Sequence, residues 1–211
     1  MWFHWIDSRA SRLNLKWTWH PNKSYKMSLK IILGPMFAGK SSELLGTIRK
    51  YSAIGWPIFV ITHSSDTRYS EKPEIVSHDK ERHPALAVRY LDNVLSTLLY
   101  IDARLIIIEE AQFFSGLKEF VLNAVEKDKK DVICVGLDGD TKRQPFGELL
   151  ELIPYCDSVE KRHAFCKRCK TPVAALFTHS EKKSKNEQVE IGGEDIYEPL
   201  CRAHYLQCTG V

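Results

Sequence analysis

Short apolar runs alternate with amphipathic segments along the first two thirds of the chain. The apolar runs are rich in Ile, Leu and Val and predict buried strands. They lie at residues 29–33, 57–62, 104–108 and 131–136. The amphipathic segments predict helices over residues 42–51, 90–99 and 114–127. Strands that alternate with helices predict an α/β fold, with a parallel sheet and right-handed crossovers.

Loop segments follow three of the predicted strands, at residues 34–41, 109–112 and 138–147. The carboxyl ends of parallel strands lie at one edge of a sheet, and open α/β sheets bind ligands there. We therefore expect the functional side chains at this edge. A further polar stretch, residues 62–83, shows little periodicity and is expected to be a functional loop.

The segment after the first strand has the spacing of a phosphate-binding loop, with Gly, four residues, then Gly-Lys-Ser. Glycines let the backbone approach phosphate oxygens, and the N-terminus of the following helix attracts the anion. Lys40 is expected at the β- and γ-phosphates and the Ser41 hydroxyl at magnesium. The expected nucleotide-binding residues are Gly34, Pro35, Met36, Phe37, Ala38, Gly39, Lys40 and Ser41. A turn that binds nothing is the alternative, and the apolar run before it and the helical pattern after it disfavour that reading.

Two acidic residues, Glu109 and Glu110, end the third predicted strand. Phosphate-loop proteins carry an acid at this position that orders magnesium. Adjacent side chains on an extended strand face opposite ways, so one carboxylate can serve the metal and the other a substrate hydroxyl. The second carboxylate would take the hydroxyl proton during phosphoryl transfer. An acidic surface turn is the alternative.

The last fifty residues contain two ligand pairs, Cys166-x-x-Cys169 and Cys201-x-x-His204. Four such ligands suit a closed tetrahedral zinc site of the structural kind. A redox Cys-x-x-Cys with an unrelated Cys and His is the alternative, and Cys208 is a possible substitute for His204. We expect a phosphate-binding domain at residues 29–160 and a small zinc-binding subdomain at residues 161–211.

Composition narrows the class of protein. The chain has 211 residues, 44% of them hydrophobic and 27% charged, which is typical of a soluble globular protein. The net charge of +3 is too small to argue for nucleic acid, and no apolar run reaches the length of a membrane span. Residues 1–28 hold four of the five tryptophans without a secretory signal pattern. We expect a disordered extension that contributes nothing to activity, or a natural start at Met27; a weak organelle-targeting helix is the alternative.

Several stretches together resemble the cellular-type (type II) thymidine kinase family. They are residues 34–42 (GPMFAGKSS), 66–70 (DTRYS), 108–114 (IEEAQFF), 136–147 (GLDGDTKRQPFG), 191–197 (IGGEDIY) and the paired metal ligands. They span about residues 29–205 in the family's order. The resemblance implies a RecA-like phosphate-loop sheet flanked by helices, with a small zinc-binding lasso subdomain. It also implies a cytoplasmic enzyme that forms a homotetramer and binds neither nucleic acid nor membrane.

The resemblance implies ATP-dependent phosphorylation of the 5′-hydroxyl of thymidine, with deoxyuridine left open, and with magnesium and zinc as cofactors. Glu110 stands at the position of the family's general base, with Lys40 and Arg68 as the other catalytic residues. Nucleotide binding would extend to Asp66, Arg68, Glu109 and Gln112, with Glu109 and Ser41 at magnesium. The nucleoside would be held by Met36, Phe113, Thr141 and Tyr197 and by a lasso loop formed by Gln188, Val189, Glu190, Ile191 and Gly192.

Four positions depart from the family's usual pattern. Glu109 stands where aspartate is common, and Thr141 stands where a phenylalanine often lies beside the base. His204 replaces a common fourth cysteine, which zinc accepts equally. Thr178, implied at the pocket for the thymine methyl group, follows Cys169 at a longer spacing than usual. Two other functions remain alternatives: a zinc-bearing phosphate-loop ATPase or nucleic-acid-binding module, and a catalytically inactive nucleotide sensor.

Overall fold

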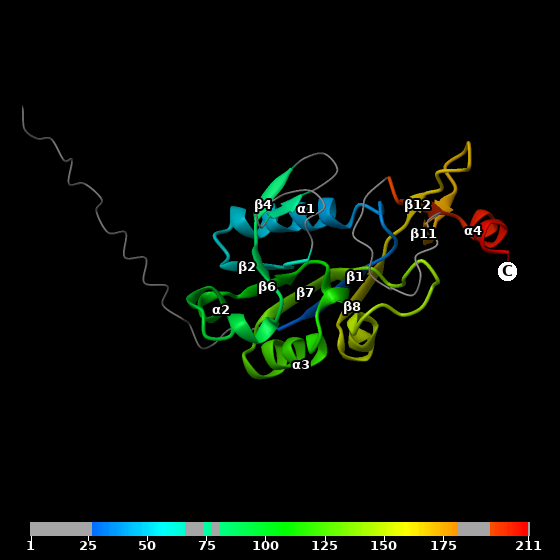
Figure 1. The fold of residues 1–211 in the computed structure, drawn as a ribbon. Helices are drawn as coiled ribbons and strands as arrows, with labels where there is room; N and C mark the ends of the chain where they lie inside the picture. The colour runs from blue at the N-terminus through cyan, green and yellow to red at the C-terminus, as the bar shows by residue number, and fades with distance from the viewer. Residues whose placement is uncertain (1–26, 66–73, 77–80, 181–194, 211) are drawn as a thin grey trace, which may run out of the picture.

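The computed structural model describes residues 27–65, 74–76, 81–180 and 195–210 (Figure 1). Within these ranges six strands form one sheet in the order β5-β2-β6-β7-β1-β8, and every neighbouring pair is parallel. The strands are β1 (Leu29–Leu33), β2 (Ile58–His63), β5 (Leu86–Val88), β6 (Leu105–Ile108), β7 (Asp131–Gly136) and β8 (Ser158–Lys161). The predicted α/β class with a parallel sheet is confirmed.

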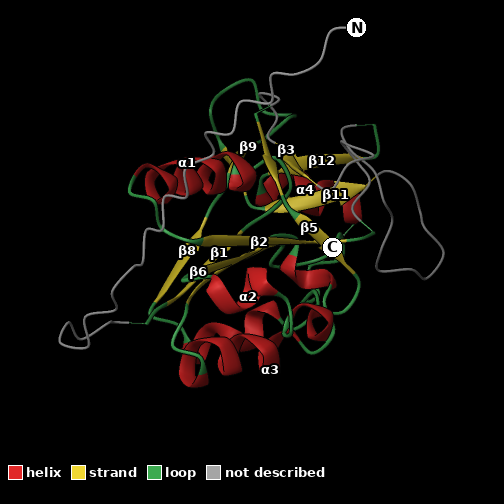
Figure 2. Cartoon of the chain, turned by 90° about the vertical axis from the view of Figure 1, so that its left-hand side faces the viewer, coloured by secondary structure: helices red, strands yellow, loops and turns green. Residues whose placement is uncertain are grey.

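Helices cover both faces of this sheet. Figures 1 and 2 show α1 (Lys40–Ala53) on one face and α2 (Leu98–Asp102) and α3 (Leu117–Leu122) on the other. Neighbouring strand residues point to opposite faces, so Ile32 packs in the cluster under α1 while Ile31 packs in the cluster with α3. Both side chains are fully buried, which explains why the strands are apolar without alternation.

The register brings the carboxyl ends of the central strands together. Leu33, the last residue of β1, pairs with Gly136, the last residue of β7. Ile108, the last residue of β6, pairs with Cys134 on β7 and with Ile61 on β2. The segments that follow β1, β6 and β7 therefore start side by side, as expected for a ligand-binding edge.

Two predicted helices differ from the observed elements. The helix predicted over residues 90–99 is wrong as one element, because the chain forms a 3₁₀ turn, η1 (Leu91–Val94), and then α2. Thr97 separates them, since its hydroxyl accepts a hydrogen bond from the Tyr100 N–H (3.2 Å) and starts a new helix. The helix predicted over residues 114–127 begins only at Leu117, after Gly116 in the left-handed region, and continues as η3 (Asn123–Lys127).

The remaining elements are short. Beyond the main sheet, strands pair antiparallel as β3 (Glu74–Val76) with β4 (Arg82–Pro84), β9 (Ala164–Phe165) with β10 (Ala174–Ala175), and β11 (Phe177–Ser180) with β12 (Tyr197–Leu200). Two 3₁₀ segments, η2 (Ala111–Phe113) and η4 (Leu149–Tyr155), follow β6 and β7, and α4 (Arg202–Thr209) ends the described chain. No helix in the described ranges is long and apolar enough to cross a bilayer. Residues 1–26 lie outside the described part.

Candidate functional site

The loop between β1 and α1 has the backbone of a tight turn. Gly34 has a φ of +146°, and a Cβ there would lie 2.4 Å from the carbonyl oxygen of Arg162. Only glycine fits this position, because the neighbouring backbone at the end of β8 occupies the space of a side chain. Phe37 and Gly39 also have positive φ, at 64° and 69°, and α1 begins at Lys40. The predicted strand–loop–helix context of the phosphate-binding pattern is present.

The loop presents donors at its centre. The Lys40 ammonium lies back over the loop and donates to the carbonyl oxygens of Gly34 (3.2 Å) and Pro35 (2.8 Å). Gly39, at the N-cap of the fourteen-residue α1, has no side chain to occupy the first-turn N–H groups. A helix N-terminus of this kind, beside a lysine, is suited to bind phosphate.

Ser41 and Glu109 meet across this loop. The Ser41 hydroxyl on α1 donates to Glu109 Oε1 at 2.7 Å, and Glu109 directly follows β6. Glu109 is buried, and its N–H donates to the Ile61 carbonyl (2.9 Å) as if β6 continued. A hydroxyl and a carboxylate joined at a phosphate-binding loop form a donor set that suits magnesium.

Glu110 does not continue the strand. It adopts φ 51° and ψ 42°, in the left-handed region that non-glycine residues rarely enter. The expectation that the two glutamates diverge because the chain is extended is therefore wrong in its reason, since a backbone turn separates them. Such strained residues cluster at functional sites and persist only where their surroundings hold them.

An apolar cluster lies at the same edge of the sheet. Met36, Leu137 and Phe146 are buried together, and Phe37, Phe113 and Tyr197 pack against them. The Phe113 and Phe146 rings meet edge to face, with centroids 5.4 Å apart. Met36, Phe113 and Tyr197 were predicted to lie at a nucleoside, whereas Leu137 and Phe146, which pack with them, were not named as site residues. Leu137 and Phe146 both lie in the family-like stretch at residues 136–147, and Leu137 also directly follows a predicted strand.

Thr178 and Thr141 are each held by one contact near this cluster. The Thr178 hydroxyl accepts from the Met36 N–H at 3.0 Å, which ties β11 to the phosphate loop. The Thr141 carbonyl accepts from the Tyr205 hydroxyl at 2.6 Å, which ties the loop after β7 to α4. Gln112, a predicted nucleotide-binding residue, is buried beside Glu110. Seven predicted site residues lie outside the described ranges: Asp66, Arg68, Gln188, Val189, Glu190, Ile191 and Gly192.

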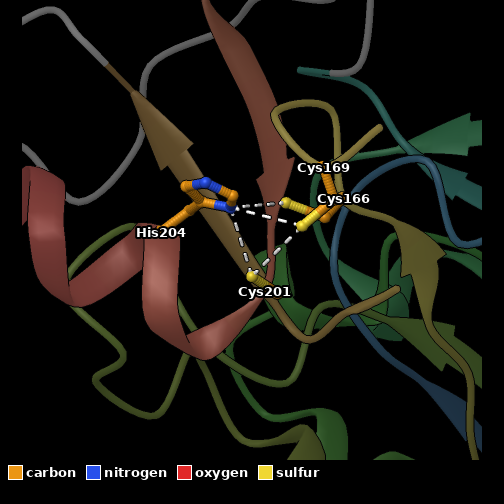
Figure 3. Close-up of side chains that lie close together, drawn as sticks. All are labelled: Cys166, Cys169, Cys201 and His204. Atoms are coloured by element: carbon orange, nitrogen blue, oxygen red, sulfur yellow. Dashed lines mark hydrogen bonds between the residues drawn. The ribbon is translucent and has the colours of Figure 1, made fainter. Parts of the chain in front are cut away.

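Four side chains from the two predicted ligand pairs converge in the carboxyl-terminal part (Figure 3). His204 Nδ1 lies 3.5 Å from Cys166 Sγ, 3.4 Å from Cys169 Sγ and 3.4 Å from Cys201 Sγ. Tetrahedral zinc with its usual bond lengths places sulfur and nitrogen ligands ~3.5 Å apart. The four side chains therefore fit zinc in both chemistry and spacing.

The clustered thiols influence one another's ionisation. Burial opposes ionisation of Cys166, but N–H groups of Cys201, Arg168 and Cys169 and the His204 ring lower its thiol pKa to about 6. Desolvation and the neighbouring thiols of Cys166 and Cys201 raise the pKa of Cys169 to about 11. Neighbouring thiolates thus oppose one another's ionisation, and a divalent cation removes that opposition.

Cys208, the possible substitute for His204, is held elsewhere. Its sulfur accepts a hydrogen bond from the Arg168 guanidinium at 2.8 Å. The same guanidinium pairs with Glu198, whose carboxyl also contacts His179 Nδ1 at 3.3 Å. Although burial opposes it, these two partners lower the pKa of Glu198 below its usual range. Through Arg168 and Glu198, these contacts connect the segment around Cys166 and Cys169 to β12.

Comparison with known proteins identifies close relatives of this sequence. The family model described as "Thymidine kinase" matches residues 27–205. A thymidine kinase of Oryza sativa subsp. japonica is 38% identical over 187 residues, covering 87% of this chain and 68% of the relative. The protein named "Thymidine kinase, cytosolic" of Homo sapiens is 36% identical, covering 89% and 76%. The thymidine kinase of vaccinia virus strain Western Reserve is 35% identical, covering 84% and 96%.

Proposed function

Because this chain belongs to the thymidine kinase family, we propose that it transfers the γ-phosphoryl group of ATP to the 5′-hydroxyl of thymidine. The observation that carries the proposal is the convergence of a phosphate-binding loop, two carboxylates and an apolar cluster at one edge of the sheet. An ATPase or nucleic-acid-binding module needs no such apolar cluster beside the phosphates, so the kinase is favoured over that alternative.

The loop from Gly34 to Ser41 would hold the triphosphate. Bound phosphate offers the Lys40 ammonium stronger, charged acceptors than the two carbonyls it contacts in the structure, and we expect it to turn toward them. Ser41 and Glu109 would hold magnesium, which neutralises charge on the β- and γ-phosphates. Asp66 and Arg68 would line the transfer site, as the resemblance implies, with Arg68 countering charge that develops on the transferred group.

Glu110 would act as the general base. As the 5′ oxygen forms its bond to the γ-phosphorus, the proton of that hydroxyl passes to the Glu110 carboxylate. The bond from the γ-phosphorus to the bridging oxygen breaks, and ADP leaves with that electron pair. Since transfer of this kind depends on positioning and charge neutralisation, the carboxylate must be held accurately beside the hydroxyl.

The nucleoside would lie over the apolar cluster. Met36, Phe113 and Tyr197 offer flat or flexible apolar surface suited to a small planar base, and the lasso residues 188–192 would supply backbone hydrogen bonds to its edge. We include Leu137 and Phe146 in this proposed pocket because they are buried in the same cluster as Met36. Thr141 gives less stacking surface than a phenylalanine, so deoxyuridine remains a candidate beside thymidine.

The cysteine–histidine cluster would hold a structural zinc. The four protein ligands would fill the tetrahedral coordination shell of the ion and leave no coordination position for a substrate, as in structural zinc sites generally. Zinc would stabilise the subdomain proposed at residues 161–211, which carries Thr178, Tyr197 and the lasso. We also propose a cytoplasmic homotetramer. The cytosolic human relative supports the location, and the tetramer rests on family resemblance alone.

Phosphoryl transfer from γ-labelled ATP across a panel of nucleosides tests this function. We expect label in the monophosphates of thymidine and, with a higher KM, deoxyuridine, with at least ~100-fold lower kcat/KM for purine nucleosides. ATP hydrolysis that is independent of nucleoside, with no labelled monophosphate, would contradict the proposal.

A further inference from the structure

Gln112 lies between the proposed general base and the proposed nucleoside pocket. Its side-chain Nε2 donates to Glu110 Oε2 at 2.5 Å, and its Oε1 accepts from the Leu137 N–H at 3.0 Å. The orientation of the amide is fixed, because a backbone N–H can only donate and so must face the amide oxygen. The amide nitrogen is then directed at the Glu110 carboxylate.

The surroundings of Gln112 hold this arrangement firmly. The residue is 2% exposed, so its amide cannot exchange these partners for bulk water without a local rearrangement. Gly136, the last residue of β7, leaves the space for the amide. A Cβ there would lie 2.3 Å from Gln112 Oε1, so any other residue would displace the side chain. A buried glutamine fitted this closely against a glycine is in a defined rotamer.

The contact has a geometric role at Glu110. The left-handed backbone at Glu110 turns the chain, and a glutamine two residues later returns to bind the carboxylate of the turned residue. The other end of the amide is bound to Leu137, which is buried with Met36 and Phe146. One side chain therefore links the position of the Glu110 carboxylate to the backbone of the apolar cluster.

We propose that Gln112 is a positioning residue that aligns the Glu110 carboxylate with the nucleoside pocket, rather than a residue that binds ATP itself. The inference rests on the proposed kinase function. It differs from the sequence-based expectation that Gln112 contributes to nucleotide binding, since the amide nitrogen contacts Glu110 and the amide oxygen contacts the Leu137 N–H. A shift of about 1 Å in a catalytic group can cost roughly 100-fold in rate. The effect should therefore fall on kcat.

The variant Gln112→Glu tests this role with little change of shape. A carboxylate at this position keeps an acceptor for the Leu137 N–H but can no longer donate to Glu110, and it repels that carboxylate. We expect kcat to fall by roughly 10- to 100-fold while KM for ATP changes less than about twofold. The temperature of unfolding reports whether the fold survives. Gln112→Leu serves as the second variant, since it removes the donor without adding charge.

A double-mutant cycle separates positioning from direct action on ATP. In a Glu110→Gln background there is no base left to position, so adding Gln112→Glu should change kcat less than about twofold. Equal loss of kcat in both backgrounds, or a rise in KM for ATP, would overturn the inference. The inference would also be overturned if the wild type is active and both Gln112 variants have the same kcat as the wild type. A wild type that phosphorylates no nucleoside would overturn the proposed function itself, and this inference with it.

Discussion

Replacement of Glu110 by glutamine is expected to lower kcat for thymidine phosphorylation by at least ~100-fold, the usual scale for a lost general base. Glutamine has nearly the same shape, and its amide oxygen can still accept the hydrogen bond from Gln112 Nε2. The left-handed backbone at this position is unchanged by the substitution, so the fold should be retained. Only the capacity to take the 5′-hydroxyl proton is lost.

Binding measurements distinguish this loss from general damage. ATP contacts the loop from Gly34 to Ser41 in our account, so the affinity of Glu110→Gln for an ATP analogue should stay within about twofold of the wild type. Glu119→Gln, on the exposed face of α3, is the matched control and should retain full activity. A kcat near the wild-type value for Glu110→Gln would remove Glu110 from the role of base.

Loss of zinc is expected to cost both stability and activity. The purified protein should contain close to one zinc per chain, and Cys201→Ser should lose most of it because one of four ligands is gone. Metal binding and folding are coupled in such sites, so we expect the unfolding temperature to fall by at least ~10 °C, which corresponds to roughly 4 kcal/mol. Activity should fall too, because the subdomain carries Thr178, whose hydroxyl binds the phosphate loop at Met36.

Cys208→Ser is the matched control for the zinc prediction. Cys208 is a nearby thiol bound to Arg168, outside the cluster of four ligands. Its replacement should leave the zinc content at the wild-type value. Well under one zinc per wild-type chain, or a Cys201→Ser protein with unchanged metal and unfolding temperature, would contradict a structural zinc site.

The central strands could be predicted from sequence because their burial leaves a strong signal. Helices cover both faces of β1 and β7, so their buried positions are apolar apart from Gly136, and the polar residues Lys30 and Asp131 stand at their half-buried positions; the predicted bounds match the observed ones. β8 was missed because it is an edge strand of mixed character, with Val159 43% exposed. Its pairing with β1 is visible only in three dimensions, although it places the Arg162 carbonyl against Gly34.

The sequence could predict which residues form the candidate site, but not how they are arranged in space. The spacing of Gly34, Lys40 and Ser41 identifies the loop, and position after a strand identifies Glu109, because local chain geometry sets both. The residue type of Glu110 carries no signal for its left-handed backbone, and the contact from Gln112 to Leu137 joins positions 25 residues apart in the sequence. No local pattern encodes the left-handed backbone of a glutamate, since it depends on what surrounds it.

A crystal structure of the protein with thymidine and a non-hydrolysable ATP analogue tests the central claim most directly. The claim is that the phosphate loop and Glu110 act on opposite sides of one transferring phosphoryl group. We predict the 5′ oxygen within ~3 Å of a Glu110 carboxylate oxygen and directed at the γ-phosphorus. A complex with Glu110 distant from the 5′ oxygen, and that oxygen directed away from the γ-phosphorus, would contradict it.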